Sequence, residues 1–232
     1  MKKPILVSFI TLFVVAAFVL TACAPKVLTA EQVVQKMAGN SKNLKTGHSD
    51  LQMKISAAGQ TLTGSMQGVF ENPNKSFITM DFTGTHMEVL TLSPTEIYQR
   101  ASASQAWQKA PQSVVDQYGN AFDLTKDPEK LLKYYQNLKL VGKETINGVD
   151  IYHLSFELDM LAVMKAFGVN MASMSGVDFK GPAFIESWVG SADFFTRKMT
   201  EKFIMTSEGQ EVNVEVTVNL TELNKPVEIP TP

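Results

Sequence analysis

Cysteine is almost absent from the sequence, because Cys23 is the only one in 232 residues. A chain with one thiol forms no internal disulfide, so packing alone must hold its fold together, even in an oxidising compartment. An excess of one charge is also lacking: 21 Lys and Arg stand against 23 Asp and Glu, for a formal net charge of −2. This balance offers no electrostatic basis for binding nucleic acid, and we expect none to bind.

The sequence also has little that resembles catalytic or metal-binding machinery. Its three histidines, His48, His86 and His153, stand far apart and lack the H-x-x-x-H spacing of a metal site. It contains neither a G-x-S-x-G elbow nor a glycine-rich phosphate loop. The acidic stretch "DLTKDPEK" lacks the ligand spacing of a calcium loop, and Asp127 is better interpreted as a helix cap. We therefore expect a non-enzyme with no catalytic residue, no metal and no cofactor.

The N-terminus carries the one long apolar run. Lys2 and Lys3 precede residues 5–20, which are almost wholly apolar, as in a secretory signal peptide. The run is short for a bilayer crossing, which needs about 20 residues. It ends in Leu20-Thr21-Ala22-Cys23, which resembles a bacterial lipobox, whose cysteine is acylated after the chain is cut just before it. The alternative is an ordinary signal peptide with an incidental cysteine.

The lipobox predicts a mature protein fixed to a membrane. We expect residues 1–22 to be removed as a lipoprotein signal peptide and Cys23 to be lipidated. Residues 23–28 would form an acylated tether on the extracytoplasmic face of the cell membrane, which is the periplasmic side if the organism has an outer membrane. Two acyl chains hold a protein to a bilayer without any basic patch.

Strand-like segments dominate the remaining sequence. Apolar and polar residues alternate with a period of two, which indicates a sheet with one dry and one wet face. The alternation is cleanest at Val212, Val214, Val216, Val218 and Leu220. Asn147-Gly148 is a strong hairpin signal. Strands are predicted at 51–55, 62–70, 78–82, 86–92, 95–100, 183–189, 194–206 and 212–220. Since the early strands follow one another without helices, they should pair antiparallel.

A few helices are predicted around these strands. Thr29 caps the first, with Gln32 completing a capping box and Gly39 ending it. Asp127 and Pro128 open a second, whose apolar side is Leu131, Leu132, Tyr135 and Leu138. Residues 158–174 form a third, and 111–118 a short fourth.

The predicted fold class is α+β. It consists of a single curled antiparallel sheet, a half-barrel of about ten or eleven strands, that covers a few helices. Residues 29–225 would form one domain, followed by an extended, proline-rich tail at 226–232.

The whole mature chain resembles a known family of lipoproteins. The matching pieces, in order, are "SKNLKTGHSDLQMKI", "GVFENPNKS", "IYQRASASQAWQKA", "GKETINGVDIYHLSFEL", "ESWVGSADFFTRKMTEK" and "ELNKPVEIPTP". Together they are similar to the LppX/LprG-type bacterial lipoproteins, which share a fold with the LolA and LolB lipoprotein carriers. The resemblance implies a LolA/LolB-like half-open barrel with an apolar cavity between sheet and helices. It also implies binding of lipids, glycolipids or acyl chains.

One helix offers a candidate ligand-binding surface. The five residues Met160, Met164, Phe167, Met171 and Met174 are spaced by four, three, four and three, which places them on one side of the predicted helix. Methionine adapts to irregular shapes, so this side could act as a lid over the sheet or could simply fill the core. From the facing sheet, the candidate cavity residues are Ile78, Met80 and Phe82.

Two glycines in the predicted strand 62–70 also allow two interpretations. Gly64 and Gly68 are either bulges that let the sheet curl or places where the interior is left unfilled.

The residues leave two functions open. The first is a membrane-anchored lipoprotein that binds a lipid or acyl chain in an apolar cavity, as carrier, chaperone or sensor. The second is a non-enzymatic interaction or structural lipoprotein of the cell envelope, with a self-packed core and an envelope protein as partner. The two functions differ in one structural expectation: the first requires an open space between the sheet and the helices, and the second requires none.

Overall fold

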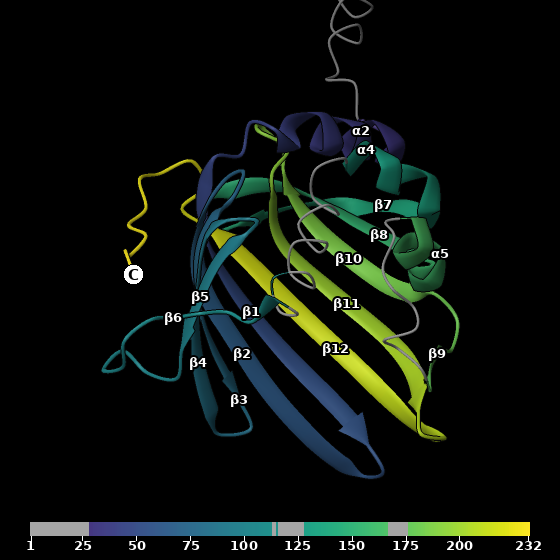
Figure 1. The fold of residues 1–232 in the computed structure, drawn as a ribbon. Coiled ribbons are helices and arrows are strands. Elements are labelled where there is room, and N and C mark those ends of the chain that lie inside the picture. The colour runs from purple at the N-terminus through teal and green to yellow at the C-terminus, as the bar shows by residue number, and fades with distance from the viewer. Residues whose placement is uncertain (1–27, 113–114, 116–127, 167–175) are drawn as a thin grey trace, which may run out of the picture.

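A single antiparallel sheet organises the chain (Figure 1). The computed structural model describes residues 28–112, 115, 128–166 and 176–232. The twelve strands of the sheet are β1 (Thr46–Ala57), β2 (Gln60–Glu71), β3 (Lys75–Phe82), β4 (Thr85–Ser93), β5 (Glu96–Arg100), β6 (Gln108–Lys109), β7 (Tyr135–Ile146), β8 (Val149–Leu158), β9 (Val177–Phe179), β10 (Ala183–Gly190), β11 (Thr196–Ser207) and β12 (Gln210–Thr221).

The order of the strands joins the two ends of the chain at the middle of the sheet. It runs β6-β5-β4-β3-β2-β1-β12-β11-β10-β8-β7, and β9 pairs with β11 outside this path. The long pairing of β1 with β12, from His48↔Thr221 to Ala57↔Val212, connects the N-terminal meander to the C-terminal hairpins. Figure 1 shows the sheet curled but open, with β6 and β7 at its edges. The predicted fold class is confirmed.

The first helix, α2 (Ala30–Ser41), begins as the sequence predicts. The Thr29 backbone N–H donates to Gln32 Oε1 at 3.0 Å, and the Gln32 N–H donates to Thr29 Oγ1 at 3.3 Å. The predicted end at Gly39 is wrong by two residues. Gly39 does not adopt the left-handed conformation that ends a helix, and the chain stays helical to Ser41. Asn40 Nδ2 donates to the Asp193 carbonyl at 3.1 Å, which ties this end to the β10–β11 turn.

The second helix is shorter than predicted. It consists of α4 (Pro128–Leu131) and one 3₁₀ turn, η1 (Leu132–Tyr134). The expected helical positions Tyr135 and Leu138 belong to β7, where Tyr135 pairs with Leu158. Tyr135 also stacks on Phe156 with ring centroids 4.2 Å apart. Pairing with β8 therefore overrides the helical pattern. The predicted cap Asp127 lies outside the described residues.

The third predicted helix is described only in part, as α5 (Met160–Ala166). Asp159 Oδ1 accepts a hydrogen bond from the Ala162 N–H at 3.0 Å and so caps it. Leu158, expected in this helix, ends β8. None of the helices in the described part of the chain is long and apolar enough to cross a bilayer.

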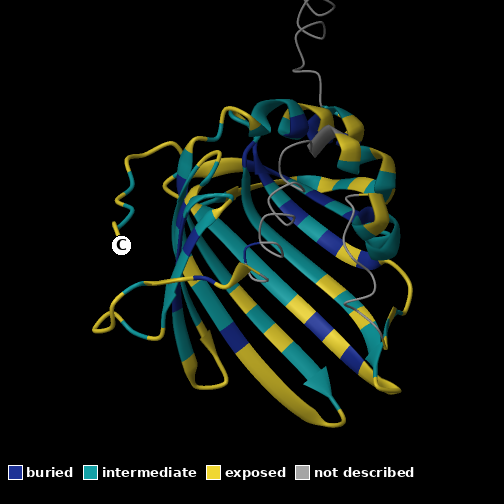
Figure 2. Cartoon of the chain, viewed as in Figure 1, coloured by how far each residue is buried: buried dark blue, intermediate teal, exposed yellow. Residues whose placement is uncertain are grey.

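Two apolar clusters anchor opposite parts of the sheet (Figure 2). In the first, Val33 and Val34 of α2 pack on Leu154 of β8 and Val189 of β10. The second joins Val115 and Ala110 to Val89 of β4 and Ile97 of β5. The sheet is thus covered by α2 at β8 and β10 and by Val115 at β4 and β5, and the strands between them carry the site described below.

Loss of the α2 cap should be measurable. We expect Thr29→Ala to lower the free energy of unfolding by about 1 kcal/mol, because the first turn loses a hydrogen-bond acceptor. Urea denaturation followed by circular dichroism would measure it. Gln35→Ala, at an exposed position in the same helix, is the matched control and should leave stability unchanged. Equal midpoints for the two variants would contradict the assignment.

Candidate functional site

The face of the sheet against which α2 and Val115 pack, here called the inner face, is apolar across its width. Cross-strand partners form rows that run from edge to edge. The first row is Leu154, Ser187, Met199, Val218, Leu51, Met66, Met80 and Met87. The second row is Phe156, Ile185, Glu201, Val216, Met53, Gly64 and Phe82. Flexible methionine side chains therefore line the middle of the inner face.

Burial divides the inner face into sealed sides and an accessible middle. Leu154 and Val189 under α2 are fully buried, and so is Ile97 in the opposite cluster. The middle strands differ in part: Leu51, Met53, Met66, Val216 and Met199 are only half-buried, whereas Val212 and Val214 of β12 are buried. Near the hairpin ends, Leu62 is 45% exposed and Phe82 37% exposed. These half-buried side chains leave apolar surface accessible in the middle of the inner face.

The site residues predicted from the sequence fall into two groups. Ile78, Met80 and Phe82 all lie on the inner face of β3. Met160 and Met164 lie on α5, where both are half-buried. Cys23 and the other three helix residues lie outside the described residues: Phe167, Met171 and Met174.

The two glycines of β2 let neighbouring groups approach closely. The β1–β2 and β2–β3 ladders run through Gly64 and Gly68 without a register shift, so the bulge interpretation is wrong. A Cβ at Gly64 would lie 2.5 Å from Cδ2 of Phe82, so this ring occupies the space that the glycine leaves. A Cβ at Gly68 would lie 2.5 Å from the Phe77 carbonyl oxygen.

Several inner-face residues were missed by the sequence-based choice of site. Met53, Met66, Met87 and Met199 belong to the same surface as Met80. Period-two alternation indicates which face each of these methionines takes on its own strand. Only the register between strands shows that the methionines form one surface.

Glu201 is the exception in the second row. Its carboxyl lies on the inner face between Ile185 of β10 and Val216 of β12. Burial among apolar side chains raises the pKa of Glu201 above its usual value of 4.5.

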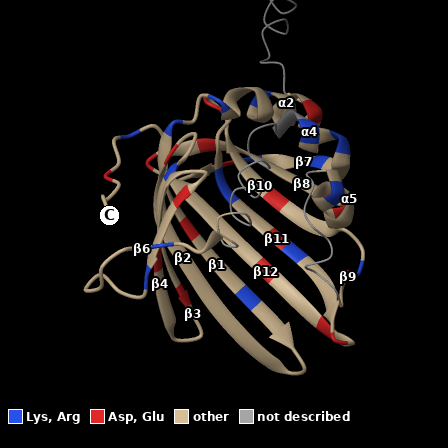
Figure 3. Cartoon of the chain, in the orientation of Figure 1, with Lys and Arg blue, Asp and Glu red and all other residues tan. Residues whose placement is uncertain are grey.

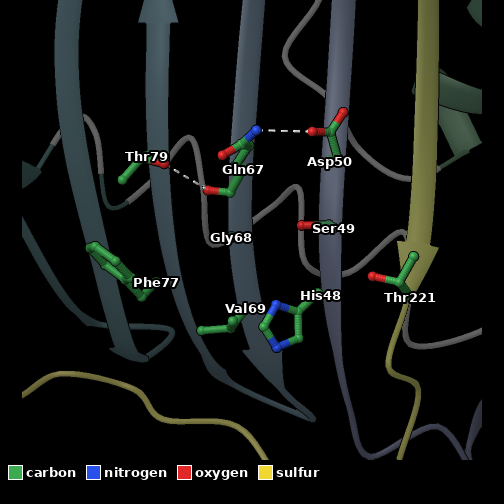
Figure 4. A pocket seen from close by; sticks show the side chains of 9 residues that line it. All are labelled: His48, Ser49, Asp50, Gln67, Gly68, Val69, Phe77, Thr79 and Thr221. Carbon is green, nitrogen blue, oxygen red and sulfur yellow. Dashed lines mark hydrogen bonds between the residues drawn. The ribbon is translucent and has the colours of Figure 1, made fainter.

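The opposite, outer face carries a shallow groove of about 340 Å³, which is lined by polar side chains together with Val69 and Phe77 (Figure 4). Gln67 Nε2 donates to Asp50 Oδ2 at 3.1 Å, and Thr79 Oγ1 donates to the Gln67 carbonyl at 3.1 Å. These side chains satisfy one another, and they alternate with the inner residues Leu51 and Met66. The groove therefore belongs to the wet face rather than to the apolar site.

The histidines and tryptophans also have structural partners on the strands. The His153 ring stacks on Trp188 at 4.4 Å and its Nε2 lies 3.0 Å from Glu186 Oε1. The His86 pKa is raised, mainly by its hydrogen bond with Asp81. Across the described residues, no group of three or more His, Cys, Asp or Glu side chains could hold a metal ion. Charges of both signs are interspersed over the elements (Figure 3).

A curled, open antiparallel sheet with helices on an apolar inner face defines a fold class that solved lipoprotein structures share. Lipoprotein LppX of Mycobacterium tuberculosis is 12% identical, with a TM-score of 0.52 over 87% of this chain and 98% of that chain. LprF of Mycobacterium bovis is 15% identical, with a TM-score of 0.52 over 88% and 96%. No family model matches the sequence, and no curated protein does. At these low identities the TM-scores show a shared fold alone, and the expected LppX-type fold is confirmed.

Proposed function

We propose that this protein is a lipoprotein of the cell envelope that binds a lipid or acyl chain against the middle of the inner face. The observation that carries the proposal is the half-burial of the apolar side chains there, between two sealed clusters. The likeness in fold to lipoprotein LppX and to LprF supports it. Each buried methylene contributes about 0.8 kcal/mol, so roughly ten would contribute about 8 kcal/mol.

The anchor would set the orientation of the binding face. If Cys23 is acylated, the five residues from it to Leu28 reach at most about 18 Å, so α2 lies close to the bilayer. The middle strands β1 and β12 each have 12 residues. Strands of that length extend about 40 Å, and β1 leads away from α2 toward the β1–β2 hairpin. The half-exposed Leu62 and Phe82 then lie at the end far from the membrane, where a ligand could pass to an envelope partner.

The proposal predicts bound lipid in protein purified without its anchor. A chain that starts at Ala24 keeps every described residue, and we expect organic extraction and mass spectrometry to find co-purifying lipid in it. It should also take up the neutral fluorescent probe N-phenylnaphthylamine. Clean protein from several expression hosts, together with no uptake of the probe, would contradict the proposal.

A substitution at the centre of the inner face should block uptake. Met53→Trp places a large ring opposite Gly64, and we expect it to lower probe affinity about tenfold or more without unfolding the protein. Lys54→Trp, at an exposed position on the other face of the same strand, is the matched control. If Met53→Trp instead overpacks a closed core, it should cost about 1–3 kcal/mol of stability. That result, without bound lipid, would favour the self-packed interaction module.

A further inference from the structure

Glu201 is the charged residue in a row that is otherwise apolar. Its cross-strand partners are Ile185 on β10 and Val216 on β12, and Met53 lies one strand further on. Along β11, the residues on the same face are Met199 and Phe203. No titratable group stands among these neighbours. The carboxyl therefore faces apolar surroundings on its own strand and on both paired strands.

Two other buried or half-buried charged residues on or beside the sheet are paired, whereas Glu201 is not. Glu88 is 5% exposed and its Oε2 accepts from Arg100 Nε at 2.6 Å. Arg197, four residues before Glu201 on β11, forms an ion pair with Asp193. Within the described part of the chain, Glu201 has neither a hydrogen bond nor an ion pair. An unpaired carboxylate among apolar groups costs free energy, and a leucine there would not.

The position of Glu201 suits a ligand that enters along the inner face. Ser207, at the end of β11, is the sixth residue after Glu201, which corresponds to about 20 Å of strand. Between them lies the cross-strand row of Phe203, Val214, Ile55 and Leu62, in which Val214 is buried and Leu62, near the β1–β2 hairpin, is exposed. A hydrocarbon chain on these residues would bring a polar group to the carboxyl.

We propose that Glu201 is a specificity-determining residue that binds a hydrogen-bond donor, an ammonium or a hydroxyl group, on the apolar ligand. The inference rests on the proposed function, since it concerns the same face. A carboxylate accepts hydrogen bonds and attracts a cation, so it complements an ammonium group best and a hydroxyl group next. It repels a fatty-acid carboxylate, which offers no donor at neutral pH.

The ammonium and hydroxyl ligands should differ in their response to pH. Because burial raises the Glu201 pKa, protonation removes the charge at a higher pH than for an exposed glutamate. Affinity for an alkylamine should therefore fall as the pH is lowered through the raised pKa of Glu201. Affinity for an alcohol should persist, because the protonated carboxyl can still accept a hydrogen bond.

Ligands of equal chain length test the proposal. Dodecylamine, dodecanol and laurate would each be titrated against bound N-phenylnaphthylamine at neutral pH, with the chain that starts at Ala24. We expect dodecylamine, and then dodecanol, to displace the probe at least tenfold more effectively than laurate, the factor that one hydrogen bond to a buried charged group provides. Glu201→Gln should remove most of this preference and improve laurate binding.

The control removes the same charge from the other face of the sheet. Glu215 lies beside Val216 on β12, with its side chain 51% exposed, and Glu215→Gln should keep the wild-type ranking. Laurate binding as tightly as dodecylamine, or an unchanged ranking in Glu201→Gln, would overturn the inference and leave the proposed function standing. If neither the probe nor any of the three ligands binds, the proposed function itself fails.

Discussion

Gly68→Ala should lower the free energy of unfolding by about 2–3 kcal/mol, because the new methyl group meets backbone rather than a movable side chain. Its Cβ would lie 2.5 Å from the Phe77 carbonyl oxygen and 3.1 Å from the Ile78 Cα. Strand β3 must shift to relieve this contact, and that shift disturbs the β2–β3 ladder. Urea denaturation of the variant would measure the loss.

Two other glycines make the comparison specific. A Cβ at Gly142 on β7 meets no atom within 4 Å, so Gly142→Ala should keep or slightly raise stability. At Gly64 the nearest atom belongs to the Phe82 ring, which is 37% exposed and can turn aside. Gly64→Ala should therefore cost less than Gly68→Ala. Equal losses at Gly68 and Gly142 would show that the close approach of β2 and β3 is not required.

Gly68→Ala should also affect the proposed binding site. Ile78, the cross-strand partner of Gly68, and Met80 both lie on the part of β3 that would shift. We expect Gly68→Ala to weaken uptake of the neutral probe, whereas Gly142→Ala should not.

Local features of the sequence predicted much of the sheet, because strands and turns depend on near neighbours. The alternating valines of β12 specify one dry face whatever strand lies beside them. Asn147-Gly148 forms its hairpin with both φ angles positive, at 51° and 77°. The turn at Glu208-Gly209 has the same form, with φ of 52° and 80°. In each case the glycine accepts a conformation that other residues avoid.

Features that depend on distant partners could not be predicted in the same way. The apolar spacing from Leu131 to Leu138 fits a helix, but β8 is available as a strand partner and Tyr135 joins it. Alternation along the strand already puts Glu201 on the same face as Met199 and Phe203. Only the register, which pairs it with Ile185 and Val216, shows that its neighbours across the strands are apolar as well. The face on which a residue lies can be predicted from its own strand, but its neighbours on that face depend on which strands pair and in which register.

Glu201→Leu should raise the free energy of unfolding by about 1–3 kcal/mol near pH 8, because it removes an unpaired carboxylate from apolar surroundings. The gain should depend on pH in a defined direction. Burial raises the pKa of the folded-state carboxyl above its ordinary value of 4.5, so the folded protein binds the proton more tightly than the unfolded chain. The wild type therefore loses stability as the pH rises through the raised pKa, and it recovers that stability below the ordinary value.

The difference between Glu201→Leu and wild type should thus be largest near pH 8 and smallest near pH 4. Thermal unfolding at several pH values would measure it, and ionisation of all other groups cancels in the comparison. Glu215→Leu, on the outer face, should show no such pH-dependent gain. A gain of the same size at every pH would show that the folded and unfolded chains bind this proton equally tightly, so that the pKa of Glu201 is not raised on folding. A loss of stability would show that the carboxyl has a partner. If Glu201→Leu is more stable near pH 8 and also loses the preference for donor head groups, the carboxylate lowers stability in exchange for ligand selectivity, which is the combination expected of a binding residue rather than of a packing residue.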